Sequence, residues 1–410
     1  MVADGRRITR NIVAISTGEL LSKLLGFAGI AYIGRVAGGD VLGMIGFSTA
    51  VLGYFSLAGN PGLETIGVRE IAAGRQTHSR TVSLVTGMRL LLLVPVAALF
   101  LLFALTTSID ATTRTVLLLF GASLLLQPFS LDFYFSGRER MGAVALRRVL
   151  QAAIYLGGIL LLVSSTEDAL LIPVIFAAAM MMSYLAQIFQ TREPGLLRRA
   201  EITRDRLRTL LRSAFVVGGA QLLIMTYLQI DLVMCGLMLS TGEVGLYTAD
   251  QRLAAAIAVL PWVILQASLP MLSRVENDVD RRNGLLRLLR LMLPAGAVIS
   301  VAGYLLAEPI LLTVFGNSYL AGSDALRILF LNTGLVFVNM ALANPLLAWK
   351  RDREYLLIVL GGAALNIALN AVLIPTMGIE GAAWATVAAE VLVLLLALRA
   401  QRSILLHRSG

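Results

Sequence analysis

Residues 366–390 read NIALNAVLIPTMGIEGAAWATVAAE, and this stretch decides the fold class. Two apolar segments flank Pro375 and Gly378, which interrupt regular helix. Asn366 and Asn370 lie four residues apart, and so share one face of the first segment. The second segment carries a threonine and a glutamate at the same spacing. Polar groups inside segments otherwise suited to lipid indicate a functional or packing site within a membrane-spanning protein.

The rest of the chain has the same apolar character. It has 410 residues, 58% of them hydrophobic and 14% charged, against about 25% charged in a soluble domain. Its mean hydropathy is +0.82, which excludes a large soluble protein. We predict an all-α polytopic membrane protein with twelve transmembrane helices, at about 11–34, 43–65, 82–105, 115–136, 145–164, 169–190, 213–235, 245–270, 290–314, 325–348, 355–375 and 380–399.

The first apolar segment is long and lacks a small-residue cleavage pattern, so we interpret it as a mature span rather than a signal peptide. Cys235 is the only cysteine. An intramolecular disulfide is therefore excluded, and a cysteine-based metal site is not expected.

Basic residues set the predicted orientation. Arginines and one lysine cluster at the N-terminus, in every second loop and in the tail, which together hold 28 of them. The intervening loops hold only Arg35 and Arg114. Basic residues stay in the cytoplasm, so we expect a multi-pass protein of the cell membrane with both termini cytoplasmic. The topology rule also accounts for the net charge of +9, so we expect no nucleic-acid partner.

The chain looks internally doubled. Leu289-Arg-Leu-Met-Leu-Pro294 in span nine echoes Met88-Arg-Leu-Leu-Leu-Leu-Val-Pro95 in span three. We therefore predict two six-helix lobes, residues 1–195 and 196–410, with a central cleft between them. The basic loop 191–212 would join the lobes, either lying on the anionic inner leaflet or as a solvated connector.

Motifs of nucleotide binding and of nucleophilic catalysis are missing. The sequence has no Gly-x-x-x-x-Gly-Lys-[Ser/Thr] loop and no Gly-x-Ser-x-Gly elbow. Its only histidines, His78 and His407, fall in cytoplasmic regions of the predicted topology. We therefore expect a transporter, not an enzyme, with no tightly bound cofactor.

Charges within the spans are the best functional indicators, because a charge at the bilayer centre needs a partner or a wet cavity. Glu19 and Lys23 lie four apart and share one face of span one. They are either a self-neutralised pair or a cation aimed into the cleft. Asp250 and Arg252 in span eight are either a structural ion pair, with Asp231 as a further partner, or part of the same substrate-binding surface.

Other charges are expected nearer the membrane surfaces. We expect Arg89, Asp132 and Arg290 to extend to the inner headgroups. Glu308 and Arg327 are expected to be solvated near the outer surface.

Span seven places a carboxylate at the depth of the opening stretch. Asp231, Asn366, Asn370 and Thr386 should converge in the outer half of the second lobe, with Glu390 one turn deeper. A carboxylate, two amide oxygens and a hydroxyl suit a small hard cation. The asparagines could equally pack helices by hydrogen bonding.

Several stretches carry a family resemblance, in order along nearly the whole chain. They are GLETIGVREIA (62–72), LDFYFSGRERM (131–141), IDLVM (230–234), GEVGLYTA (242–249), LPMLSR (269–274) and the opening stretch. With these, the chain resembles the polysaccharide-transport family of oligosaccharide flippases, within the multidrug/oligosaccharidyl-lipid/polysaccharide exporter superfamily.

The resemblance implies alternating access and a polyprenyl (pyro)phosphate-linked oligosaccharide moved from the cytoplasmic to the outer leaflet. It implies a Na+ site at Asp231, Asn366, Asn370, Thr386 and the backbone near Ala382. Our alternative hypothesis is H+ coupling, by protonation of Asp231 or Glu390. Asn370 stands where related lipid II flippases can carry a second carboxylate. It further implies cleft cations at Lys23 and Arg252, with Glu19 and Asp250 beside them.

Polysaccharide polymerase and glycosyltransferases are the partners that this reading implies. A small-molecule or drug exporter of the same superfamily is the main alternative. A major-facilitator transporter and a non-transport scaffold or enzyme are the others.

Overall fold

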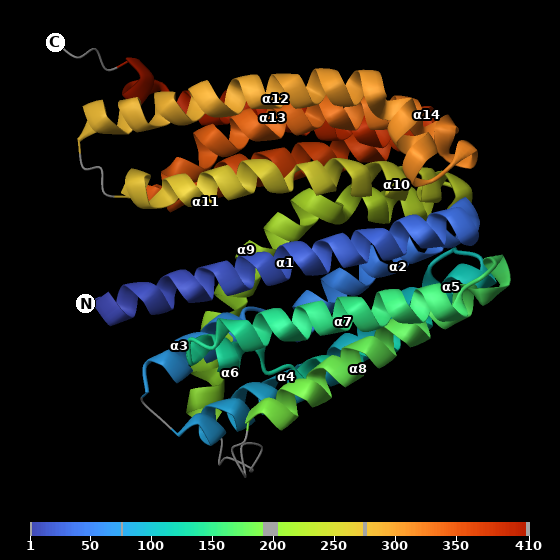
Figure 1. Ribbon diagram of the computed structural model, residues 1–410, viewed down its shortest axis with the longest axis horizontal. Helices are drawn as coiled ribbons and strands as arrows, with labels where there is room; N and C mark the ends of the chain where they lie inside the picture. The colour runs from blue at the N-terminus through green and yellow to red at the C-terminus, as the bar shows by residue number, and fades with distance from the viewer. Residues whose placement is uncertain (1, 75–76, 192–203, 274–276, 407–410) are drawn as a thin grey trace. The chain divides into compact units, whose positions relative to one another are not determined.

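The computed structural model describes residues 2–74, 77–191, 204–273 and 277–406, which are helical wherever they are regular (Figure 1). The chain divides into two compact units, Met1–Leu222 and Leu223–Gly410, within one long helix. The predicted tether 191–212 lies largely outside the described residues. The division into six-helix lobes at residues 195 and 196 stays a prediction.

The described residues of the first unit form eight α-helices and three short 3-10 helices, and α9 is shared with the second unit. They are α1 (Val2–Val36), α2 (Gly38–Gly59), α3 (Leu63–Ala72), α4 (His78–Thr106), α5 (Ala111–Gly121), η1 (Ala122–Leu125), η2 (Gln127–Phe129), α6 (Asp132–Gly137), α7 (Met141–Leu162), η3 (Thr166–Leu170), α8 (Leu171–Thr191) and α9 (Arg204–Met238).

Small residues let the helices of the first unit approach closely. α1 packs along α7, and α7 along α8 (Figure 1). A Cβ added to Gly18 of α1 would lie 2.5 Å from the Cβ of Ala145 in α7. Glycine and alanine at such a crossing are typical of helices that associate in lipid, where van der Waals packing replaces the hydrophobic effect.

The first unit contains two breaks in its helices. α2 ends at Gly59, and α3 begins after Gly62, which has a left-handed φ of 70°. A Cβ on Gly62 would lie 2.6 Å from the Cβ of Val217 in α9. Glycine is therefore required here by both backbone and packing. The second break follows α5, where the chain passes through η1 and η2 around Pro128.

The second unit is built around α13. Its elements are the end of α9, then α10 (Thr241–Ile257), α11 (Val259–Ser273), α12 (Asp278–Val314), η4 (Asn317–Gly322), α13 (Ser323–Ala348) and α14 (Asp352–Leu406). α10, α11, α12 and α14 all contact α13. α10 begins with a capping box, in which Ser240 and Glu243 satisfy each other's backbone N–H groups.

α14 folds back on itself at Gly378, whose φ of 59° and ψ of −137° are not helical. Residues on the two arms touch: a Cβ on Gly362 would lie 2.7 Å from Cγ2 of Val393. The predicted spans eleven and twelve are the two arms of this hairpin. Pro375 and Gly378 mark the turn because proline removes a helical hydrogen bond and glycine accepts positive φ.

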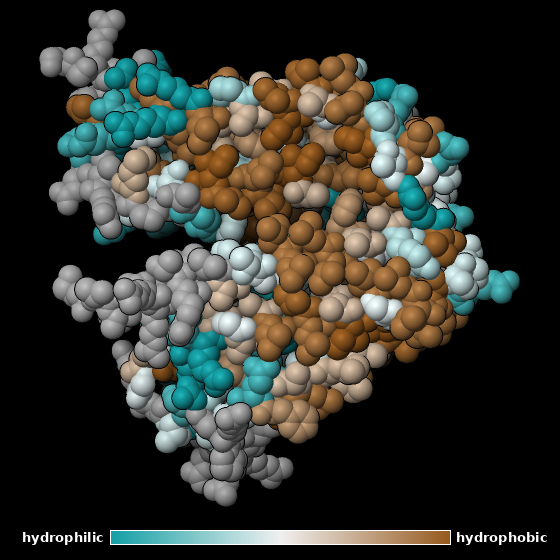
Figure 2. Space-filling view, viewed as in Figure 1, coloured by the Kyte–Doolittle hydropathy of each residue, from teal (hydrophilic) through white to brown (hydrophobic). Residues whose placement is uncertain are grey.

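Ten helical segments in the described residues are long and apolar enough to cross a membrane. The last, Asp352–Leu405, contains both arms of α14, and the predicted first span falls in α1, which is not among the ten. On the face shown in Figure 2, hydrophobic side chains cover the middle of the helices and polar ones gather toward their ends. A polytopic membrane protein is confirmed, and the number of twelve spans stays a prediction.

Two expectations about charged residues were wrong. Arg89 and Asp132 do not extend to headgroups: their exposed fractions are 2% and 5%. Arg147, one of the 28 basic residues that the topology rule assigned to the cytoplasmic side, lies within α7 and is 9% exposed. The physical reason is that Arg147 and Asp132 satisfy each other inside the unit, which counts of basic residues along a sequence cannot detect.

Candidate functional site

Asp231 of α9 is buried in the second unit and well supplied with donors. The Tyr247 hydroxyl donates to its Oδ2 at 2.5 Å, and Gln251 Nε2 lies 3.3 Å from its Oδ1. Tyr247 and Gln251 are four residues apart and therefore share one face of α10. Hydrogen bonds of this kind offset the cost of burying a carboxylate.

The asparagines of the opening stretch form a second cluster across the α14 hairpin. Asn370 Nδ2 donates to Asn366 Oδ1 at 2.9 Å, and Asn366 Nδ2 lies 3.5 Å from Thr386 Oγ1. The Thr386 hydroxyl donates in turn to the Ala382 carbonyl at 3.0 Å. Asn370 is fully buried, and its Oδ1 has no partner among the described residues.

Tyr247 links the two clusters, because its hydroxyl also interacts with the side chain of Thr386. Asp231, Asn366, Asn370 and Thr386 therefore belong to one polar network that spans α9, α10 and α14. The sequence predicted their convergence but not the tyrosine between them. The signal was available: Tyr247 lies in the stretch GEVGLYTA, one helical turn before Gln251.

The donor set of this network suits a monovalent cation better than a divalent one. No group of three or more His, Cys, Asp or Glu side chains comes together among the described residues. One carboxylate with neutral amide, hydroxyl and carbonyl oxygens supplies a single negative charge. The unpartnered Asn370 Oδ1 is the atom in this network with unused capacity as a ligand.

Glu390 occupies a separate buried site one turn further along α14. Its carboxylate accepts hydrogen bonds from the Tyr227 hydroxyl and from Asn339 Nδ2, the latter at 2.5 Å. Asn339 also donates to the Glu390 backbone carbonyl at 2.9 Å. Glu390 thus joins α14 to α9 and α13. Tyr227 and Asn339 were not singled out by the sequence, because a lone amide or phenol in a span is common.

Asp250 and Arg252 behave differently from one another. Asp250 has no exposed surface, and neither carboxylate oxygen has a partner among the described residues. It packs against Gly322 of η4, where a Cβ would lie 2.8 Å from its Oδ2. The ion pair expected between Asp250 and its neighbours is therefore absent from the described residues. Arg252 is half-buried on the same helix.

Glu19 and Lys23 form the ion pair that their spacing predicted. Lys23 Nζ lies 2.9 Å from Glu19 Oε1, and Arg148 of α7 lies 3.8 Å from Glu19 Oε2. The Lys23 side chain remains 55% exposed. Two cations around one carboxylate leave this cluster with a net positive charge.

A buried network holds the first unit together. Arg147 donates two hydrogen bonds of 2.7 Å to the Asp132 carboxylate, and Gln187 donates to the same carboxylate at 2.6 Å. Gln187 Oε1 accepts from the backbone N–H of Leu131 at 3.2 Å. Every partner is satisfied from within the unit, so this network is structural.

The described residues thus form an all-helical polytopic membrane protein with charged and amide side chains buried among apolar helices. The family model described as "Polysaccharide biosynthesis protein" matches residues 8–276. The chain belongs to this family.

Two curated relatives come from Haloferax volcanii. The probable low-salt glycan biosynthesis flippase Agl15 is 23% identical over 399 residues, which cover 92% of this chain and 80% of the relative. The probable flippase AglR is 29% identical over 186 residues, 43% of this chain and 38% of the relative. The chain thus spans well under half of AglR in that match. These relatives are flippases and not enzymes.

Two solved structures share the fold. The lipid II flippase MurJ, in an inward closed conformation, has a TM-score of 0.77 at 15% identity, covering 95% of this chain and 87% of MurJ. An inward-facing multidrug resistance MATE family transporter of the MOP superfamily has a TM-score of 0.75 at 14% identity, covering 96% and 98%. The fold is therefore that of MurJ and MATE transporters.

Proposed function

We propose that this chain is a flippase that moves a polyprenyl (pyro)phosphate-linked oligosaccharide from the cytoplasmic to the outer leaflet by alternating access, for surface polysaccharide biosynthesis. Family membership and the flippase relatives support the class of cargo. Glycosyltransferases that build the cargo and a polymerase that consumes it are the expected partners. The cell membrane, with both termini cytoplasmic, is the expected location.

Lys23 is the observation that carries the proposal. It lies in α1, in the predicted first span, beside Leu20, Leu21 and Leu24, which are all exposed. An exposed ammonium inside a span is tolerated only where water or an anion reaches it. Because Glu19 neutralises only one of the two cations around it, Lys23 can donate a hydrogen bond to a phosphate oxygen of the cargo. We propose that Arg252, with Asp250 beside it, serves the same role in the second unit.

The coupling ion is part of the proposal. We infer that Asp231, Asn366, Asn370, Thr386 and the Ala382 carbonyl hold a monovalent cation such as Na+. A bound cation would supply charge that favours one conformation over the other. Glu390, tied to α9 and α13, is the second candidate for coupling, by taking up a proton.

A multidrug or small-molecule exporter is the second candidate function. The observation that favours it is the structural match to the MATE family transporter, which extends over 98% of that transporter's chain. The two functions differ in what accumulates when the gene is lost. A drug exporter would change efflux and leave every polyprenyl-linked glycan unaltered.

The deciding experiment is deletion of the gene, followed by extraction of polyprenyl-linked glycans and their assignment to a leaflet. We expect one lipid-linked oligosaccharide to accumulate on the cytoplasmic side. Wild type should relieve this, and Lys23→Ala combined with Arg252→Ala should not, although the variant reaches the membrane. Unchanged intermediates would refute the flippase and direct the work to drug-efflux assays.

A further inference from the structure

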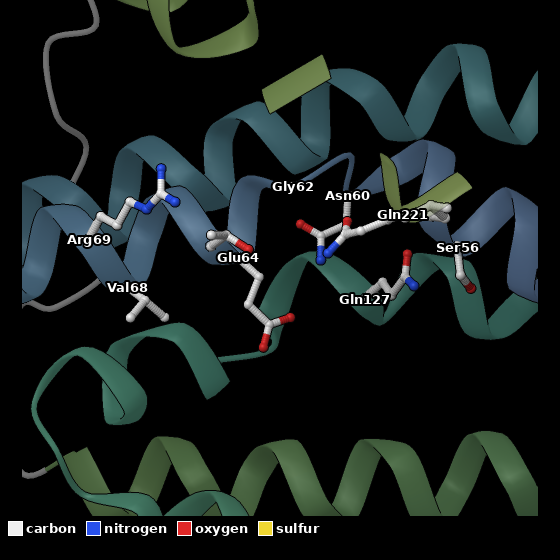
Figure 3. Close-up of a pocket in the computed structure, with 10 residues that line it drawn as sticks. Ser56, Asn60, Gly62, Glu64, Val68, Arg69, Gln127 and Gln221 are labelled. Atoms are coloured by element: carbon white, nitrogen blue, oxygen red, sulfur yellow. The ribbon is translucent and has the colours of Figure 1, made fainter. Parts of the chain in front are cut away.

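The first unit contains a cavity of about 690 Å³ beside the break between α2 and α3 (Figure 3). Sites for small ligands usually have volumes of about 300–1,000 Å³. Three amides line it, from Asn60, Gln127 and Gln221, together with the hydroxyl groups of Ser56 and Thr65. The lining is therefore unusually polar for a unit whose helices are suited to lipid.

Both helix breaks of the first unit meet at this cavity. Asn60 follows the last residue of α2, and Gln127 opens η2. Interrupted helices at membrane depth are tolerated only where they are buried in protein or line a water-filled cavity. Gly62, which permits the first break, lies in the wall, and so does Gln221 of α9. The breaks thus turn backbone and amide groups toward one space.

Arg89 holds one of these amides in a fixed orientation. Its Nε donates to Asn60 Oδ1 at 3.1 Å, and its Nη1 donates to the Ser130 carbonyl at 2.8 Å. The guanidinium also stacks on the Phe133 ring, 5.1 Å from the centroid. Since Oδ1 of Asn60 is engaged, its amide NH2 is left to donate to a ligand.

Arg89 also has unused hydrogen-bonding capacity. Its Nη2 is buried and has no partner among the described residues. A pocket of about 10 Å³, lined by Arg89, Gln127 and Pro128, adjoins it. This is room for about one water molecule. Such a water would connect the buried guanidinium to Gln127 in the cavity wall.

The charges in the wall favour a neutral ligand over an anion. Glu64 and Arg69 both line the cavity, so their charges offset each other. Glu64 also attracts the buried Arg89 guanidinium, so the wall itself offers no net positive charge to draw in a phosphate. Figure 3 shows Asn60, Glu64 and Gln127 around the same opening. Amides, hydroxyls and a carboxylate offer both hydrogen-bond donors and acceptors, and a sugar hydroxyl uses both.

We propose that this cavity binds the sugar headgroup of the cargo, through hydrogen bonds between the sugar hydroxyls and the side chains of Asn60, Glu64, Gln127 and Gln221, and does not bind its phosphate. The inference rests on the proposed function. The end of α2 faces the cytoplasm in the predicted topology, so the site would take the headgroup from the inner leaflet. Arg89 is a positioning residue that orients Asn60.

The test uses the full chain in nanodiscs and two probes. One is the polyprenyl-linked oligosaccharide extracted from cells that lack the gene, and the other is polyprenyl phosphate of the same chain length. We expect Gln127→Ala and Gln221→Ala each to weaken binding of the first probe about tenfold and to leave binding of the second within about twofold. Gln190→Ala, a half-buried amide of α8 outside the cavity, is the matched control.

Every outcome of this test either supports or overturns binding of the sugar in this cavity. Equal loss for both probes would show a phosphate site or damaged packing, and unchanged binding of both would show that the amides touch no sugar. Either result overturns the inference about the cavity, and it leaves the proposed flippase function standing if the wild-type protein still transports the cargo. If cells lacking the gene accumulate no lipid-linked oligosaccharide, the proposed function itself is wrong, and the inference about the cavity is wrong with it. Glu64→Gln provides a second check, since removing its charge should strengthen binding of polyprenyl phosphate only if phosphate enters this cavity.

Discussion

The Tyr247 hydroxyl donates to Asp231 Oδ2 at 2.5 Å, so the carboxylate that a cation would need is already bound by a phenol. A cation at Asp231 must displace this donor or share the oxygen with it. The phenol is therefore a competitor that sets how strongly the cation binds.

We expect Tyr247→Phe to have two opposite effects on stability. Without sodium, loss of a hydrogen bond to a charged group should lower stability by about 1.5–3 kcal/mol. With sodium, the rise in melting temperature should exceed that of wild type, since the competing donor is gone. Thermal unfolding in detergent, in sodium chloride against choline chloride, measures both.

Asp231→Asn and Asn370→Ala provide the controls for this prediction. Both should abolish the sodium-dependent rise, because one removes the only charge of the site and the other removes its unpartnered oxygen. An undiminished sodium effect in Asp231→Asn would place the ion elsewhere, with Glu390 as the next residue to replace.

The buried pair of Asp132 and Arg147 should dominate the stability of the first unit. Asp132→Ala leaves a guanidinium uncompensated, which costs about 3–5 kcal/mol in buried pairs. Asp132→Leu combined with Arg147→Met should lose much less. The exposed pair of Arg327 and Glu308, 2.6 Å apart, is the comparison, where Arg327→Ala should cost about 0–1 kcal/mol. Equal losses at both pairs would contradict a structural role for Asp132.

The membrane-spanning architecture could be predicted from the sequence, because a run of about 20 apolar residues has few other uses. The meeting of Asp231 with Asn366 and Thr386 could be predicted as well, from helix direction and depth alone. Burial of Arg147 could not, since an arginine next to a cytoplasmic loop gives the same pattern whether it faces solvent or Asp132. The cavity beside Asn60 depends on two helix breaks distant in sequence, and no local pattern pairs them.

Gly62→Ala should separate backbone strain from steric clash. The φ of Gly62 is 70°, and an added Cβ would lie 2.6 Å from Val217 and 2.9 Å from the Ala214 carbonyl. Gly74 has a similar φ of 61° with nothing within 4 Å. We expect Gly74→Ala to cost about 1 kcal/mol from the left-handed backbone, and Gly62→Ala clearly more. Similar melting temperatures for the two variants would show that α9 moves enough at this contact to accommodate the added methyl group.

The exposed cation of α1 gives a prediction about transport. Lys23→Ala should abolish transport while the melting temperature stays near that of wild type, since an exposed ion pair contributes little to stability. Lys23→Arg should retain activity, because it keeps the charge.

Glu19→Gln should act in the opposite direction from Lys23→Ala. Without the carboxylate, Lys23 and Arg148 present two uncompensated cations, so polyprenyl phosphate should bind more tightly and leave more slowly. We therefore expect a lower dissociation constant together with a lower transport rate, because cargo held too strongly is not released. Measuring binding in nanodiscs and flipping in proteoliposomes separates the two. If Glu19→Gln weakened binding, Glu19 would be orienting Lys23 toward the phosphate, and the pair would act as one positioned donor.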